Sequence, residues 1–84
     1  MVIRRTKDFA DAFRKLPREV QRIFHKQEKI FRESWLDSRL HVKRLKDLPG
    51  AYSFRVTRRY RVLFYFDRDN TVFFVIGHRK DIYE

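Results

Sequence analysis

Two arginines in the last third of the chain have the type and spacing to hold an anion. Arg55 lies in the alternating run 52–56, and Arg61 begins the strongly apolar run 61–66; the two runs read as neighbouring β-strands. If residues 57–59 form the hairpin loop, Arg55 lies directly opposite Arg61. Like charges at such positions destabilise a sheet, on the scale of the roughly 0.2–1 kcal/mol that cross-strand pairs contribute. An anion held between the two guanidinium groups would make the interaction of this pair favourable. Two arginines that point apart into water are the plainer interpretation.

Other candidates for chemistry surround this pair. Lys43, Arg44 and Lys46 end the segment before the Pro49-Gly50 turn. They are read either as a solvated run or as contacts to flanking phosphates, which raise affinity without reading bases. His78 follows the last apolar run, and histidine exchanges protons near neutral pH.

No metal ion or other cofactor is expected. The other histidines, His25 and His41, lie far from His78 in the sequence and are expected at the surface. Three histidines scattered in this way show no metal-ligand spacing, and without cysteine there is no thiolate ligand either.

The strands that would position these residues form a meander. Residues 51–56, 60–67 and 71–77 alternate or are continuously apolar and are separated by polar loops, which predicts three antiparallel strands. Residues 2–5 can add a short edge strand at the N-terminus. The segment 34–48 follows no single period and is interpreted as a connector pinned by its apolar residues.

Two helices are predicted between the first strand and the connector. Thr6 has the residue type of an N-cap, and Pro17 ends the first helix and begins the second. The second helix has an apolar stripe at spacings of three and four residues, and its other face is basic. Gln27 is the one polar residue within the stripe and is expected at its boundary, because an unpaired buried amide costs about 1–3 kcal/mol. The two helices are expected to form a hairpin that covers the meander.

Composition limits the class of protein and its partners. The chain has 84 residues, which suits one small domain over residues 1–84, and its net charge is +10 from 21 Lys and Arg against 11 Asp and Glu. Such a charge favours polyanionic partners, either nucleic acid or an acidic protein. With neither a membrane-length apolar run nor an apolar signal region, a soluble cytoplasmic protein is expected.

Four stretches of the chain together resemble the RelE/ParE superfamily of bacterial and archaeal toxins from toxin–antitoxin pairs. They read TKDFADAFRKLPREVQ, LHVKRLKDLPGAYSFRV, RYRVLFYF and VFFVIGHRKDIY, and they follow one another over residues 6–83. No single stretch is diagnostic, but the four in this order and spacing are specific. The resemblance implies an α+β fold: an N-terminal strand, a helical hairpin and a three-stranded antiparallel meander, with the helices on one face of a small antiparallel sheet.

The resemblance implies one of two activities. RelE-like toxins are mRNA interferases: their concave basic face binds mRNA in the ribosomal A site, and they cleave it without metal by attack of the 2′-hydroxyl on the neighbouring phosphate. ParE-like toxins inhibit DNA gyrase and cut no nucleic acid. The basic residues around the sheet favour the RelE branch. An inactive relative that only binds RNA is a third interpretation.

The resemblance also assigns roles to individual residues. Arg61 matches the strand arginine that contacts the scissile phosphate, and Arg55 matches a second basic position of the sheet. Ser53 stands at the partner position, where relatives often have another basic residue, and this departure is the feature that supports an inactive relative. Arg79, or alternatively Lys80, matches a phosphate-binding arginine after the last strand.

Proton transfer is expected from His78 or Tyr83. The tyrosine matches a C-terminal residue that in the family stacks on a base or aids proton transfer, although packing with Ile82 at the edge of the core is the plainer alternative. Stacking on a base is worth roughly 1–3 kcal/mol. The resemblance suggests that the remaining residues of the site bind the substrate or ribosomal RNA, namely Lys43, Arg44, Lys46, Ser53 and Lys80.

A toxin of either branch implies a cognate antitoxin as partner. It is expected to present acidic and apolar residues that wrap the helical hairpin or cover the basic face of the sheet. Gyrase becomes the target if the ParE interpretation holds.

Overall fold

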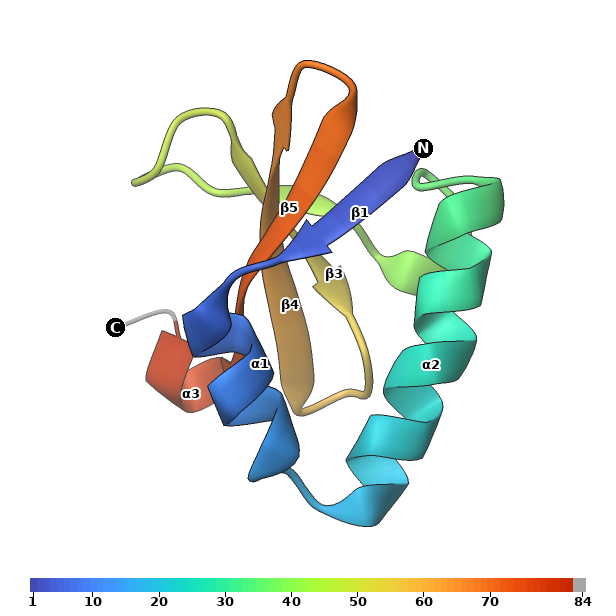
Figure 1. Cartoon of the computed structure of the whole chain (residues 1–84), viewed down its shortest axis with the longest axis vertical. Helices are drawn as coiled ribbons and strands as arrows, with labels where there is room; N and C mark the ends of the chain where they lie inside the picture. Colours follow the sequence, from blue (N-terminus) through green and yellow to red (C-terminus); the bar gives the residue numbers. More distant parts are fainter. Residues whose placement is uncertain (83–84) are drawn as a thin grey trace.

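A five-stranded sheet carries two helices on one face and a basic cleft on the other. The computed structural model describes residues 1–82, and Figure 1 shows the arrangement of the elements. In chain order the elements are β1 (Val2–Arg5), α1 (Lys7–Arg14), α2 (Arg18–Glu33), the 3₁₀ helix η1 (Ser38–Leu40), β2 (Lys43–Arg44), β3 (Ala51–Arg55), β4 (Tyr60–Asp67), β5 (Asn70–His78) and α3 (Arg79–Ile82). The strand order is β1-β5-β4-β3-β2. The predicted α+β fold with its helical hairpin is confirmed.

The antiparallel meander of β3, β4 and β5 is the centre of the sheet, as predicted. Arg55 pairs with Arg61 across β3 and β4, so the predicted register is correct at the position that matters for the site. The β4–β5 connection is tighter than expected, because Asp67 pairs with Asn70 and leaves a turn of two residues. Arg68 in that turn has a φ of 56°, in the left-handed region that the turn requires.

The sheet is mixed, whereas the resemblance implied an antiparallel one. β1 pairs with β5 in parallel, with Ile3 opposite Thr71. Adjacent parallel strands need a long crossover connection, and everything from α1 to β4 lies between these two strands in the chain. The apolar pattern of β1 predicts a strand but not its direction relative to β5, because no hairpin connects the two strands.

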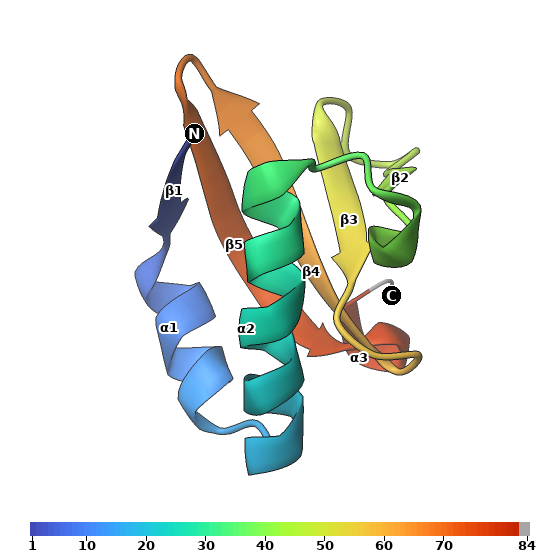
Figure 2. The same ribbon diagram turned by 90° about the vertical axis from the view of Figure 1, so that its right-hand side faces the viewer.

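The helices form where the caps predicted them. The Thr6 side chain accepts a hydrogen bond of 3.1 Å from the backbone N–H of Phe9, and α2 follows directly after Pro17. α2 runs across one face of the sheet, with α1 beside it over β5 (Figure 2). Fully buried phenylalanines fill the space between the two layers: Phe9, Phe24, Phe31, Phe54, Phe64 and Phe73. Burial of so many aromatic rings supplies a core to a short and polar chain.

Gln27 was expected at the boundary of the apolar stripe, and that prediction was wrong. Its side chain is 8% exposed and its Nε2 donates to two backbone carbonyls, 2.9 Å to Arg55 and 3.2 Å to Arg39. The amide avoids the cost of unpaired burial because the last residue of β3 and the middle residue of η1 both offer it an acceptor. α2 is thereby tied to the two segments that flank the basic cleft.

Two segments have more structure than the sequence indicated. The connector over 34–48 contains η1 and the two-residue edge strand β2, where Lys43 pairs with Ser53. The polar tail folds into the short helix α3 directly after β5. Over residues 1–82, none of the helices has the length and apolar character that crossing a membrane requires.

Candidate functional site

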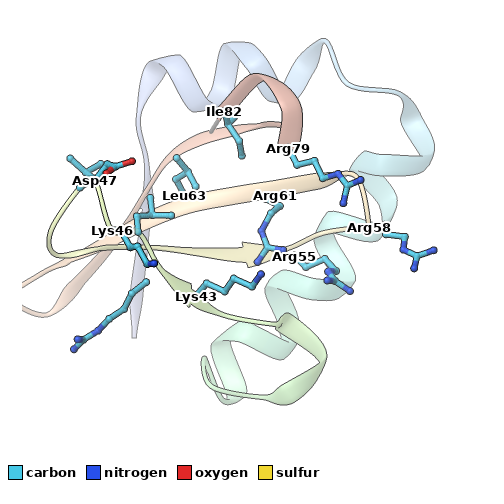
Figure 3. A pocket seen from close by; sticks show the side chains of 12 residues that line it. Lys43, Lys46, Asp47, Arg55, Arg58, Arg61, Leu63, Arg79 and Ile82 are labelled. Carbon is cyan, nitrogen blue, oxygen red and sulfur yellow. The ribbon is translucent and has the colours of Figure 1, made fainter. Parts of the chain in front are cut away.

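The cleft lies on the face of the sheet opposite α2. Phe54 and Val62 point into the core, so the alternation along β3 and β4 turns Arg55 and Arg61 to the other face. The walls come from β2 with the loop after it and from α3 (Figure 3), and the volume is about 650 Å³. Twelve residues line it: Lys43, Arg44, Leu45, Lys46, Asp47, Leu48, Arg55, Arg58, Arg61, Leu63, Arg79 and Ile82. Seven of these are cations and one is acidic.

Arg61 is fixed at the floor of the cleft. Its side chain is only 5% exposed, and its Nε donates to the Oγ of Ser53 at 3.3 Å. Its Nη2 donates to the backbone carbonyl of His41 at 2.8 Å. His41 directs that carbonyl from a left-handed conformation with a φ of 48°. Neighbouring β3 and the loop after η1 therefore hold the guanidinium in place before any ligand arrives.

Arg55 stands opposite Arg61 and is held differently. Its Nε is buried, and among the described residues it has no hydrogen-bond acceptor. A buried donor without an acceptor costs about 1–3 kcal/mol, in addition to the repulsion between the two guanidinium groups. An anion bound between Arg55 and Arg61 would oppose both costs.

Positive charge in the cleft is left uncompensated. Within residues 1–82, no carboxylate lies at ion-pair distance from Lys43, Arg44, Lys46, Arg55, Arg58 or Arg79. The ion pairs of this part of the chain lie elsewhere, for example between Arg5 and Glu28 and between Arg39 and Asp37. A concave surface lined by one sign of charge focuses its field outward, so the cleft attracts anions.

The structure brings together most of the predicted site residues. Arg55, Arg61 and Arg79 line the one cleft, although they come from β3, β4 and α3. The cations of the β2 region, Lys43, Arg44 and Lys46, line the same cleft. These six residues therefore share one concave, basic surface.

Other predicted residues lie outside the lining. Ser53 was expected to bind RNA, but it is fully buried and supports Arg61 instead. Lys80 is exposed and does not line the cleft. His78 is half-buried beside Tyr60, with ring centroids 5.5 Å apart, and its Nδ1 accepts from the backbone N–H of Lys80 at 3.2 Å. Tyr83 lies outside the described residues.

Sequence reasoning did not predict six of the twelve lining residues, among them Arg58 and Ile82. Arg58 sits in the β3–β4 loop, and a loop residue gives no periodicity from which to predict its direction. Ile82 reaches the cleft because α3 packs against β5: a Cβ added to Gly77 would lie 3.0 Å from the Cγ2 of Ile82. The backbone N–H of Arg79 also donates to the carbonyl of Arg59 at 2.7 Å, which anchors the start of α3 beside the hairpin.

The cleft is suited to binding and stabilising a phosphate. A guanidinium can hold two phosphate oxygens at once and stays charged at any relevant pH. Asp47 is the one carboxylate in the lining, and His78 is the last residue of β5, outside the lining. Among the described residues, no three His, Asp or Glu side chains are grouped so that they could share a metal ion. Fold and cleft together describe a small α+β protein with a concave basic surface on one face of its sheet.

Known structures with the same fold are toxins and toxin–antitoxin complexes. A RelB–RelE antitoxin–toxin complex from Methanococcus jannaschii is 21% identical over 99% of this chain and 95% of that one, with a TM-score of 0.77. A YoeB/ParE toxin from Agrobacterium tumefaciens is 13% identical over 94% and 99%, with a TM-score of 0.79. The toxin–antitoxin complex RelBE2 from Mycobacterium tuberculosis is 25% identical over 93% and 96%, with a TM-score of 0.67.

The sequence matches no protein-family model and no curated protein. The chain has the fold of the RelE/ParE toxins, and the resemblance seen in the sequence is confirmed at the level of the fold.

Proposed function

We propose that this protein is the toxin of a toxin–antitoxin pair and acts as a ribosome-dependent mRNA endonuclease. The observation that carries the proposal is the cleft with seven cations, six of which lack a carboxylate partner among residues 1–82. A surface with this charge is suited to a nucleic-acid backbone. The fold adds support, because fold neighbours include RelE proteins bound to RelB.

The proposed reaction is transfer within the RNA strand. The 2′-oxygen loses its proton and attacks the neighbouring phosphorus, and the bond from phosphorus to the 5′-oxygen breaks. The departing 5′-oxygen takes up a proton, which leaves a 2′,3′-cyclic phosphate and a 5′-hydroxyl. Arg61, Arg55 and Arg79 would stabilise the charge on the phosphorane oxygens. Lys43, Arg44 and Lys46 would hold the flanking phosphates.

Proton transfer is assigned to His78 or Tyr83. The Nδ1 of His78 accepts a hydrogen bond from the backbone N–H of Lys80. In the neutral imidazole, the ring proton of His78 is therefore on Nε2. That nitrogen can donate to a leaving oxygen if the substrate reaches the end of β5. His78→Gln and Tyr83→Phe, compared in the cleavage assay, decide between the two residues.

The test is cleavage of an mRNA on programmed ribosomes with the RNA ends mapped. The wild-type protein should cut, and Arg61→Ala should abolish cutting. Because Arg61 is buried and hydrogen-bonded, its loss also threatens the fold, so the exposed Arg79→Ala is the second variant. Arg18→Ala, which removes an exposed charge from the helical layer, is the matched control and should cut normally. An intact mRNA with the wild-type protein would contradict the proposal.

A gyrase inhibitor of the ParE kind is the alternative. One neighbour of the fold is a YoeB/ParE toxin, and here Ser53 stands at the place of a second basic residue. Inhibition of DNA supercoiling by purified gyrase, with mRNA left intact on ribosomes, would favour it. RNA binding with neither activity would identify an inactive relative.

An antitoxin is proposed as the partner in either case. Several neighbours were solved as toxin–antitoxin complexes, among them RelB with RelE. The cleft calls for a segment rich in Asp and Glu, because each carboxylate placed there would meet at least one uncompensated cation. Co-purification of the protein with the product of an adjacent gene tests this partner.

A further inference from the structure

A second hollow on the same face of the sheet lies next to the basic cleft. It has a volume of about 390 Å³ and is lined by residues that include Leu48, Tyr65, Phe66 and Phe74. Leu48 lines both this hollow and the cleft, so the two are adjacent. We refer to the hollow as the aromatic groove. It contains no charged residue, whereas the cleft beside it is dominated by cations.

The aromatic groove lies in line with the paired arginines. Arg61, Leu63 and Tyr65 occupy alternate positions of β4 and therefore share one face of the sheet. Tyr65 is four residues from Arg61, which corresponds to about 13 Å along the strand. At about 3.4 Å per stacked nucleotide, that distance spans about four stacked nucleotides, and fewer when the strand is extended.

The ring of Tyr65 in the aromatic groove remains accessible. Tyr65 is 38% exposed, although large aromatic side chains usually contribute to a core, whereas the ring of Phe66 packs on the other face of the sheet, 5.0 Å from that of Trp35. Tyr65 packs against the half-buried Phe74, with ring centroids 5.4 Å apart and planes at 55°, which supports the tyrosine ring from behind. One ring is thus held by packing and still offers surface to a ligand.

We propose that Tyr65, supported by Phe74, forms a stacking site for one base of a single-stranded RNA whose backbone lies in the basic cleft. This inference rests on the proposed function, because it requires RNA in the cleft. A groove of cations beside exposed rings is the arrangement that binds single strands, since every base has a face that can stack. Stacking does not read the hydrogen-bonding edges of a base. The site therefore fixes the position of the strand and accepts different bases.

The charges beside the aromatic groove favour an RNA base over an apolar protein segment. The seven cations next to it complement a phosphodiester strand, whereas an apolar segment would leave them unmatched. A base also keeps its polar edges in solvent while its face covers the ring. Asp67 follows Tyr65 at the next outward position of β4. Its carboxylate repels phosphate, so the strand is expected to end or turn away beyond the stacked base.

The test measures binding of an RNA octamer that the protein cannot cleave. With 2′-O-methyl groups throughout, the octamer lacks the attacking hydroxyl, and fluorescence anisotropy reports its Kd. Tyr65→Ala is expected to weaken binding about 5- to 150-fold, the equivalent of roughly 1–3 kcal/mol per stacked base. Tyr65→Phe keeps the ring and should stay within about twofold of the wild type. Leu36→Ala, at an apolar residue that is 65% exposed outside both hollows, is the control.

A set of octamers with one abasic nucleotide each identifies the stacked base. At one position, loss of the base should weaken binding to the wild-type protein as much as Tyr65→Ala does. With that octamer, Tyr65→Ala should have no further effect. If Tyr65→Ala and the wild type bind the intact octamer equally, the stacking site is overturned and the groove is left to an apolar protein segment.

Two further outcomes also overturn the inference. An effect of Tyr65→Ala that stays the same with every abasic octamer would mean that the ring does not stack on a base. A wild-type protein that binds no octamer and leaves mRNA uncut on ribosomes would contradict the proposed function, and the stacking site with it. Equal binding by the two proteins contradicts the stacking site alone.

Discussion

Removal of Arg55 should make the protein more stable and a poorer ligand for RNA. In Arg55→Met the apolar stem of the side chain and its packing are kept, but the charge and the buried Nε are lost. Arg55 lies directly opposite Arg61 on the neighbouring strand. The Nε of Arg55 has no acceptor among the described residues. Both features disfavour the folded state in the absence of an anion, so their removal should stabilise it.

The size of this effect follows from the two contributions. Relief of the like-charge pair contributes about 0.2–1 kcal/mol, and relief of the unpaired buried donor contributes about 1–3 kcal/mol at most. Because an ordered arginine and an ordered methionine lose similar side-chain entropy, the expected net gain is the sum of the two contributions, about 1–4 kcal/mol. For a domain of this size, each kcal/mol raises the melting temperature by about 4–8 °C.

Urea unfolding at low ionic strength measures the gain, because salt would screen the repulsion. Arg59→Met is the matched control: it makes the same charge change in the same hairpin, but at an exposed position outside the cleft. The uncleavable RNA octamer should stabilise the wild type more than it stabilises Arg55→Met. Its addition should therefore reduce the difference in unfolding free energy between the two proteins. A variant less stable than the wild type at low salt, with Arg59→Met unchanged, would refute the reasoning, since the head group of Arg55 would then be stabilising.

Three other perturbations follow from the structure. Gln27→Leu leaves the carbonyls of Arg39 and Arg55 without their donor and should cost about 1–3 kcal/mol of unfolding free energy, measured in urea; an unchanged midpoint would contradict it. Hydrogen bonds from the side chain and the backbone of Arg39 lower the pKa of Asp37 to about 2 from its usual 3.8. Because the folded pKa is the lower one, this stabilisation is complete above about pH 4 and is lost as the pH falls toward 2. The stability of Asp37→Asn should therefore decline less steeply over that interval than that of the wild type, and parallel curves would count against the ion pair. Lys46→Ala should reduce the slope of log Kd for single-stranded RNA against log salt by about 0.7, the value for one phosphate contact; an unchanged slope would place Lys46 off the RNA.

Local patterns in the sequence were sufficient for most of the architecture. The N-cap Thr6, the break at Pro17 and the apolar stripe of α2 are features of neighbouring residues, and both helices form where these features predicted them. Alternation along residues 51–67, with a short loop between, also predicted that Arg55 would face Arg61. Such features need only the periodicity of a helix or a strand, which the chain shows without its long-range contacts.

The environment of each side chain depended on contacts between distant segments. Gln27 is buried because η1 and β3 bring two carbonyls to it, and Ser53 serves Arg61 because β3 places it under the guanidinium. No local pattern contains these distances.

The cleft itself was decided by tertiary structure. The sequence by itself determined the two-layer fold, the excess of positive charge and the facing arginines of the hairpin. The folded chain decided that β1 runs parallel to β5, that α3 turns back beside Gly77, and that Arg79 and the cations of the β2 region converge on the same hollow. The physical reason is that secondary structure depends on residues a few positions apart, whereas a site depends on how whole elements pack, and packing energy is shared among many contacts at once.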